Sequence, residues 1–200
     1  MSEKYKFIGD AAYDNLISGV YPAPLVSEAP VVESNSTNDL KRGTVLVLVE
    51  NDSSLNVPKR MYYPAGLNVE TSTATGDGTK YTFEIHPHYA LKNYEKILKV
   101  TVAGTEVTDY SYNKETGEIS LAPPASGAQL KVTGAVGTPC GIVAEDVSYD
   151  SAESAYPHVP MYTAGCFDPN FLVTVNDYKL DAEDIDHLRK FGIYIEEATK

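Results

Sequence analysis

Apolar and polar residues alternate, or form short apolar runs, over most of the chain, which predicts strands. The run Gly43–Glu50 (GTVLVLVE) is continuously apolar and rich in β-branched residues, the pattern of a strand buried on both faces. Gly141–Ala144 repeats this pattern, Phe171–Val175 is a further predicted strand, and Pro157–Thr163 is predicted as an extended edge. We therefore expect a mainly β protein.

One stretch, Leu180–Glu196, has the signals of a helix instead. Asp181 suits the N-cap, and the two acidic residues that follow place negative charge at the positive end of the helix dipole. The expected buried stripe lies at helical spacing: Ile185, Leu188 and Phe191. The expected end is marked by two cations, a glycine and a short apolar run: Arg189, Lys190, Gly192 and Ile193–Ile195. We expect this single C-terminal helix to cover a sheet.

Residues 66–133 differ in pattern from the segments on either side: short alternating strands are predicted here, separated by turns at a spacing of about 8–12 residues. The loop Asn113–Gly117 predicts a hairpin between Val107–Tyr112 and Glu118–Leu121. We expect an inserted β-sandwich-like domain here. It would interrupt one discontinuous domain made of residues 41–65 and 134–200, because insertions succeed at exposed loops.

Residues 1–40 are predicted to form an N-terminal arm. Three prolines break the segment, Pro22, Pro24 and Pro30, and a polar turn cluster follows at residues 34–39. Between them, Leu25–Val32 is predicted as an edge strand, since prolines lack the N–H that a central strand needs. The arm is expected either to be unstructured or to lie along a neighbour.

Charge excludes some partners. The net charge is −12, and residues 139–200 hold 12 acidic and 4 basic side chains, which disfavours binding to nucleic acid. No apolar run is long enough to span a membrane, and the first sixteen residues lack the apolar core of a signal peptide. We therefore expect folding in a cytoplasm, with neither nucleic acid nor membrane as a partner.

Three stretches follow one another in the order of a known family: Leu40–Leu46 (LKRGTVL), Gly141–Val147 (GIVAEDV), and Tyr162–Phe167 followed by Leu180–Tyr194. Together they resemble the phage head decoration proteins related to that of bacteriophage lambda. The resemblance covers residues about 15–60 and 135–197 and fails in between. Within the insertion, Val100–Leu121 resembles small β domains of phage structural proteins.

The resemblance implies a structural virion protein and no enzyme. Such a protein assembles as homotrimers on the outer surface of the icosahedral capsid, after production in the host cytoplasm. It binds the major capsid protein and stabilises the head after expansion, and the arm, residues 1–40, would lie on the capsid. The alternative is a receptor- or carbohydrate-binding module of a phage tail or spike, in which residues 66–133 bind a host surface glycan.

No stretch predicts a metal or phosphate site. His86 and His88 share a face if they lie in a strand, but a third ligand is missing nearby. The acidic residues between Asp181 and Asp186 lack the spacing of a calcium loop. Thr75–Thr79 contains glycines without the lysine and helix of a phosphate-binding loop. We expect no metal and no cofactor.

Nucleophilic chemistry is also not predicted. Cys140 and Cys166 are too few for a disulfide framework, and we expect both to be small buried hydrophobes. Nothing resembles a nucleophile elbow or a cysteine–histidine pair, so no catalytic residue is assigned. Six tyrosines in or near the insertion either stack on sugars or, as we prefer, pack half-buried in strands: Tyr62, Tyr63, Tyr89, Tyr94, Tyr110 and Tyr112.

Overall fold

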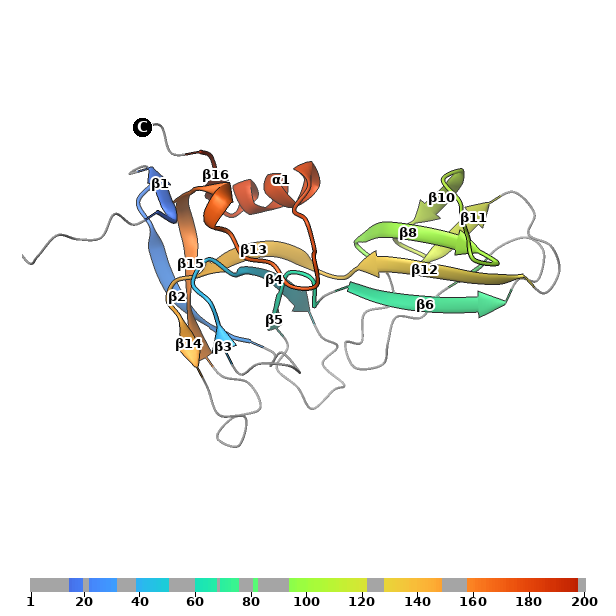
Figure 1. Ribbon diagram of the computed structural model, residues 1–200, viewed down its shortest axis with the longest axis horizontal. Coiled ribbons are helices and arrows are strands. Elements are labelled where there is room, and N and C mark those ends of the chain that lie inside the picture. The colour runs from blue at the N-terminus through green and yellow to red at the C-terminus, as the bar shows by residue number, and fades with distance from the viewer. Residues whose placement is uncertain are drawn as a thin grey trace, which may run out of the picture.

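A computed structural model describes residues 15–19, 22–31, 39–50, 60–67, 69–75, 81–82, 94–121, 128–148 and 158–197. In these residues the protein is mainly β, with several sheets and one α-helix near the C-terminus, as predicted (Figure 1). His86, His88, Tyr89 and residues 76–79 lie outside the described residues.

The main sheet has seven strands: β1 (Ile17–Gly19), β2 (Leu25–Pro30), β4 (Val45–Glu50), β5 (Arg60–Pro64), β13 (Thr138–Val143), β15 (His158–Phe167) and β16 (Ile193–Ile195). Their order is β1-β15-β13-β4-β5, with β2 and β16 also paired to β15. An isolated bridge between Val31 and Tyr62 joins the end of β2 to β5, so the sheet curls until its two edges meet there. A short separate pair joins β3 (Asp39–Leu40) to β14 (Val147–Ser148).

Strand β4 is buried on both faces, as its apolar run predicted. On one face, Leu46 packs in a cluster with Met161 that fills the inside of the curl. On the other face, Val47 packs in a cluster with Leu188 of the helix, and Val49 joins the core of the inserted region. Three different partners cover this strand, which explains why it has no polar side.

Strand β15 corrects the prediction of an extended edge at Pro157–Thr163. It runs for ten residues, and at Tyr162 it pairs with β13 on one side and β2 on the other. Pro160 within this strand has no N–H to donate to a neighbouring strand. In the structure Pro160 lies opposite Glu28, and its carbonyl still accepts a hydrogen bond from Ala144 N–H at 2.9 Å.

The predicted strand Phe171–Val175 is also corrected. Pro169–Phe171 form a short 3-10 helix, η1, whose N-cap Asp168 accepts a hydrogen bond from Asn170 N–H at 2.9 Å. Only Val173 is β-like, through an isolated bridge to Thr44. Proline and an aspartate cap start this helical turn, and the apolar run that follows is too short to form a strand of its own.

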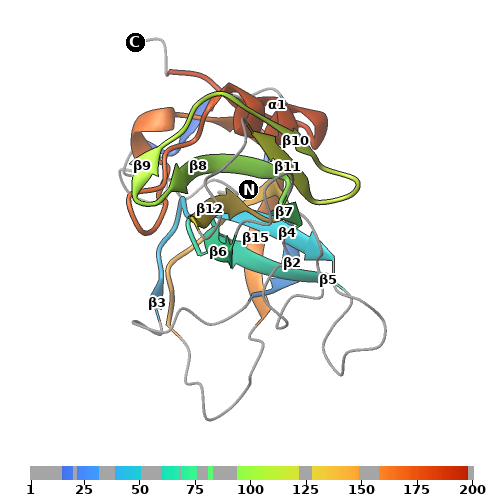
Figure 2. The ribbon, with the colours of Figure 1, turned by 90° about the vertical axis from the view of Figure 1, so that its right-hand side faces the viewer.

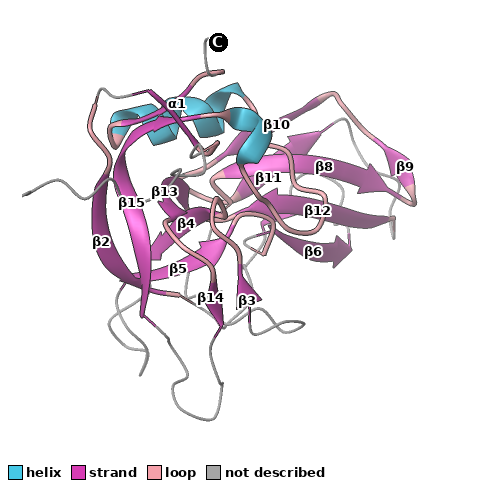
Figure 3. Ribbon diagram, turned by 60° about the vertical axis from the view of Figure 1, so that its left-hand side comes forward, coloured by secondary structure: helices cyan, strands magenta, loops and turns pink. Residues whose placement is uncertain are grey.

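The helix α1 (Ala182–Lys190) lies across one face of the main sheet (Figure 3). Asp181 is its N-cap and Gly192 follows its end with φ +86°, both as predicted. The buried stripe differs from the prediction: Leu188 is fully buried, but Phe191 is 48% exposed. Asp184 takes a buried position that the apolar pattern did not indicate.

The inserted region forms two further sheets. One contains β6 (Val69–Thr75), β12 (Gln129–Ala135), β8 (Lys96–Val102) and β9 (Thr105–Glu106), in that order; the other contains β10 (Tyr110–Asn113), β11 (Glu118–Leu121) and β7 (Tyr81–Thr82). Val100 and Leu130 of the first sheet share a core with Ile119 of the second, so the two sheets pack face to face (Figure 2). The predicted hairpin between β10 and β11 is confirmed.

This core does not stop at the predicted boundaries. It includes Met61 and Tyr63 from the main sheet, and β12 runs on to Ala135 before β13 begins at Thr138. Folding of residues 66–133 as an independent domain therefore stays a prediction, because the hydrophobic cluster is shared with the main sheet.

Part of the predicted arm belongs to the main sheet. Strand β2 matches the predicted edge strand Leu25–Val32, and β1 pairs with β15 at Cys166 and Phe167. Residues 1–14 and 32–38 lie outside the described residues. Residues 17–19 and 25–30 are thus held by the protein's own sheet.

Candidate interaction sites

A charged cluster joins the inserted region to the start of the helix. Lys96 Nζ on β8 lies 2.8 Å from Asp181 Oδ2 and 2.9 Å from Asp184 Oδ2. The Lys96 and Asp184 side chains are only 13% and 5% exposed. Tyr178 donates its hydroxyl hydrogen to Asp184 Oδ2 at 2.8 Å, and its ring centroid lies 5.3 Å from Lys96 Nζ. We call these four residues the lysine latch, because they connect two parts of the chain.

Helix capping places the two carboxylates of the lysine latch. Asp181 Oδ1 accepts hydrogen bonds from the N–H groups of Glu183 and Asp184, both at 3.0 Å. Asp184 Oδ2 in turn accepts from Asp181 N–H at 3.2 Å, which completes a capping box. The sequence predicted the cap, but it held no signal for the lysine, which lies 85 residues before Asp181.

The hydrogen bonds within the lysine latch control its protonation. Burial acts to lower the pKa of Lys96, but hydrogen bonds to Asp181, Tyr178 and Asp184 outweigh it, so the pKa is raised. Burial acts to raise the pKa of Asp181, but the bonds from Lys96 and the helix amides leave it below its usual value. Burial raises the pKa of Tyr178 to about 12. Lys96 is thus a charged structural group and not a neutral nucleophile.

The lysine latch predicts a loss of stability in acid. A carboxyl with a depressed folded-state pKa stabilises the fold above its unfolded-state pKa, and this contribution is lost as the pH falls through the folded-state value. For Asp181 we therefore expect the free energy of unfolding to fall from about pH 5 downward. Urea denaturation at a series of pH values measures this dependence.

The matched comparison is the same pH series on Lys96→Met, which removes the cation that depresses the pKa. Glu95, Glu183 and His187 lie around the same space and are unchanged in the variant, so the difference between the two curves reports on the lysine latch. We expect a shallower decline for the variant. Equal slopes in acid would contradict this assignment.

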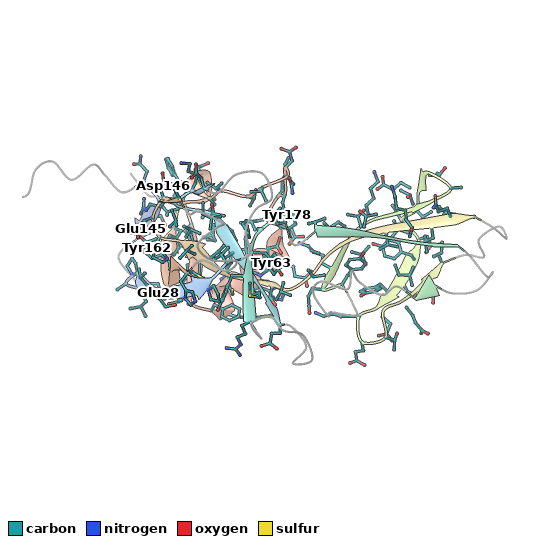
Figure 4. The ribbon with its side chains drawn as sticks, turned by 90° about the horizontal axis from the view of Figure 1, so that it is seen from below. Glu28, Tyr63, Glu145, Asp146, Tyr162 and Tyr178 are labelled. Atoms are coloured by element: carbon teal, nitrogen blue, oxygen red, sulfur yellow. The ribbon has the colours of Figure 1, made fainter. Side chains whose placement is uncertain are left out.

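A second cluster surrounds Arg42 of the LKRGTVL segment. Arg42 donates from Nε to the Ala144 carbonyl at 3.0 Å and from Nη2 to the Tyr162 hydroxyl at 3.4 Å. Its N–H donates to Asp146 Oδ1 at 2.8 Å, which lowers the pKa of Asp146. Asp146 and Tyr162 lie at the end of the molecule away from the inserted region (Figure 4). This cluster holds the segments 40–46, 141–147 and 162–167 together.

Strand β2 carries an exposed apolar surface. Its first four residues, Leu25–Glu28, are all exposed, and the side chains of Leu25 and Val26 are 60% and 57% exposed. One side of the strand pairs with β15; on the other side, no strand of the described part of the chain pairs with residues 25–30. We call this surface the β2 edge. An apolar edge strand of this kind readily pairs with another chain.

A cleft of about 360 Å³ lies between the inserted region and the segment that precedes the helix. Its polar wall is a tight turn at Asn176 and Asp177, which have φ values of +53° and +56°. Asn176 Nδ2 donates to the Gly66 carbonyl at 3.2 Å. Gly66 has φ +106°, and a Cβ there would lie 2.0 Å from the Val175 carbonyl oxygen, so only glycine permits this close approach.

The tyrosines and cysteines of the sequence analysis are mostly structural. Tyr63 and Tyr94 are buried in the core of the inserted region, and Tyr112 donates its hydroxyl hydrogen to the Tyr94 carbonyl at 2.9 Å. Cys140 and Cys166 are both buried and unpaired with each other, as expected. Burial raises the pKa of the Cys140 thiol to about 12, which keeps it protonated.

Metal ligands do not gather in the described ranges: these contain no group of three or more histidine, cysteine, aspartate or glutamate side chains placed to hold an ion. Within the same ranges, no helix has the length and apolar character needed to cross a membrane.

No protein-family model, curated protein or solved structure matches this chain. The functional inference therefore depends on the chain's own residues and surfaces.

Proposed function

We propose that this protein is a phage capsid decoration protein. It binds the outer surface of the icosahedral head as a homotrimer, contacts the major capsid protein, and stabilises the head after expansion. The segments that resemble such proteins support the proposal, because they are distant in sequence yet adjacent in space. They form β4, β13, β15 and the helix with β16, which pack together in the main sheet.

The observation that carries the proposal is the β2 edge. A decoration protein needs an exposed surface that can bury apolar side chains on its partner. Leu25 and Val26 supply one at the end of β2 away from its bridge to β5, where no other described strand pairs with the outer side of β2. Pairing of this strand with the capsid protein adds main-chain hydrogen bonds to that burial. Burying the two side chains contributes about 1.5–3 kcal/mol each.

Small contributions of this size are sufficient for the function. The protein makes and breaks no covalent bond in this proposal, so its effect is the free energy of binding summed over many equivalent sites. Rupture of the shell must break several such contacts together, which multiplies their effect. The acidic C-terminal part then faces solvent or a basic patch of the capsid.

The test is a capsid-binding assay with the double variant Leu25→Asp/Val26→Asp. Expanded heads made of the major capsid protein of the same phage are sedimented with each variant, and the bound fraction is measured. Charge on the β2 edge should weaken binding by at least about tenfold, because the carboxylates lose hydration without a partner. Deletion of residues 1–40 is a poorer test, since it removes β1 and β2 from the main sheet.

The control is Leu98→Asp, which places one carboxylate, half the added charge of the double variant, at a leucine that is 41% exposed on the inserted region. This variant should bind heads like the unchanged protein. Unweakened binding of the double variant would contradict the role of the β2 edge.

A second test is the copy number of this protein in purified virions, measured as its molar ratio to the most abundant virion protein. A ratio near one would support shell-wide decoration, and a ratio near a hundredth would contradict it.

A further inference from the structure

The cleft beside the inserted region combines an apolar wall with a polar one. Val69 of β6 and Leu98 of β8 form the apolar wall, and the turn Asn176–Lys179 forms the polar wall. Leu98 is 41% exposed and lies in β8 between the partly buried Ile97 and the exposed Lys99. The volume of about 360 Å³ falls within the range of small-molecule sites.

The outward face of the four-stranded sheet adjoins this cleft, since Val69 and Leu98 belong to its strands. Strand β12 alternates over its first four residues, with Leu130 and Val132 buried and Lys131 exposed between them. The pairing places polar residues in rows across three strands: Thr73, Lys131 and Thr101 in one row, and Thr71, Thr133 and Lys99 in the next. Hydroxyl and ammonium groups therefore recur at the spacing of strands, about 5 Å.

Charge distinguishes this surface from the rest of the protein. The chain has a net charge of −12, yet the described side chains of the face and the cleft include three lysines, Lys99, Lys131 and Lys179, against the carboxylates of Glu106 and Asp177. Of the lysines, Lys99 is engaged in an exposed ion pair with Glu106 at 3.6 Å. The surface thus favours a ligand with negative charge, although the whole protein repels polyanions such as nucleic acid.

We propose that the cleft and the adjoining threonine–lysine face bind an acidic saccharide, one that bears uronic acid carboxylates or sulfate groups. The C–H faces of a sugar ring pack on Leu98 and Val69, while its hydroxyls bond to threonine hydroxyls and to the turn at Asp177. Its acidic groups pair with Lys131 and Lys179. A peptide added as a strand would pair at the outer edge of β6 and would not cover this face, because the backbone groups of β12 are already used on both sides.

The first experiment exposes the full-length protein to an array of immobilised oligosaccharides that includes neutral, uronic-acid-containing and sulfated members. Retention on acidic members, weakened by added salt, is the expected result. A retained oligosaccharide is then titrated into ¹⁵N-labelled protein, and the amide shifts of Leu98 and Asp177 are followed. No retention on any acidic member, or retention confined to neutral ones, would overturn the proposal.

The second experiment tests whether the saccharide binds at this surface. The variant Lys131→Glu/Lys179→Glu should lower the affinity for the retained oligosaccharide by at least about tenfold, since two ion pairs are replaced by repulsion. Arg189→Glu/Lys190→Glu makes the same charge change on two exposed residues at the end of the helix and should leave the affinity unchanged. Equal loss in both variants would show that overall charge, and not this surface, is responsible.

This inference does not depend on the decoration role. Leu25→Asp/Val26→Asp should retain saccharide binding, and Lys131→Glu/Lys179→Glu should retain capsid binding. Failure of one proposal is therefore visible without failure of the other.

Discussion

Replacing Lys96 with methionine is expected to lower the free energy of unfolding by about 3 kcal/mol. The Asp184 carboxylate is 5% exposed and loses its only ion-pair partner within the described residues. Its remaining donors, the Tyr178 hydroxyl and Asp181 N–H, supply hydrogen bonds without neutralising the charge. A buried carboxylate left in this state is the main reason for the large effect.

Chemical denaturation of Lys96→Met measures this loss, and the same strand supplies a matched control. Lys99 also lies on β8, but its ion pair with Glu106 joins side chains that are 56% and 61% exposed. Lys99→Met should therefore change stability by less than about 1 kcal/mol. A similar loss in the two variants would show that the burial of the lysine latch contributes nothing.

A double-mutant cycle separates the ion pair from the loss of the lysine alone. Lys96→Met/Asp184→Asn removes both charges while the amide oxygen still accepts from Asp181 N–H. We expect the double variant to recover part of the loss, with a coupling energy of about 1–3 kcal/mol between the two positions. Additive losses would show that the two charges act independently.

The helix could be predicted from the sequence because its signals are local. Asp181 caps amides two and three residues away, and Gly192 adopts the positive φ that ends the helix. The lysine latch could not be predicted, because it depends on the distance between β8 and the helix in space. The same carboxylates that identified the N-cap carried no information about Lys96.

For the strands, too, local features could be predicted from the sequence and spatial neighbours could not. Strand β4 was predicted with both faces buried because a long apolar run has no polar side to expose. Strand β15 was predicted as an extended edge, and the sequence pattern alone does not show that β13 and β2 pair with it on its two sides. For β2 the prolines did predict an edge strand, but not the exposure of Leu25 and Val26, since an apolar residue in sequence looks the same whether its side chain is buried or exposed.

The candidate cleft depends on one residue whose role is visible only in three dimensions. Gly66 resembles any turn glycine in sequence, but in the structure it allows the segment before β6 to touch Val175. The threonines of β6 were not assigned to a particular strand from the sequence. Only the register of β6 with β12, and of β12 with β8, places them in rows with lysines.

Gly43, in the middle of the LKRGTVL segment, combines two constraints that alanine violates. Its φ is +89°, and a Cβ would lie 2.4 Å from the Phe171 carbonyl oxygen. The backbone has no room to adjust, because Gly43 N–H donates to the Val143 carbonyl and its own carbonyl accepts from Val173 N–H, both at 2.9 Å. The glycine thus fixes the entry to β4 against the segment that leads to the helix.

We expect Gly43→Ala to lower the free energy of unfolding by about 4 kcal/mol, from backbone strain and the steric clash together. Gly104→Ala is the control that separates the two terms, since Gly104 has φ +83° but nothing within 4 Å of a Cβ. That variant should lose only the conformational part, about 1 kcal/mol. Denaturant titrations of both variants measure the difference. Equal losses would mean that the main sheet can shift at β4 to accept a methyl group, and the close packing of the LKRGTVL segment on Phe171 would then not constrain the fold.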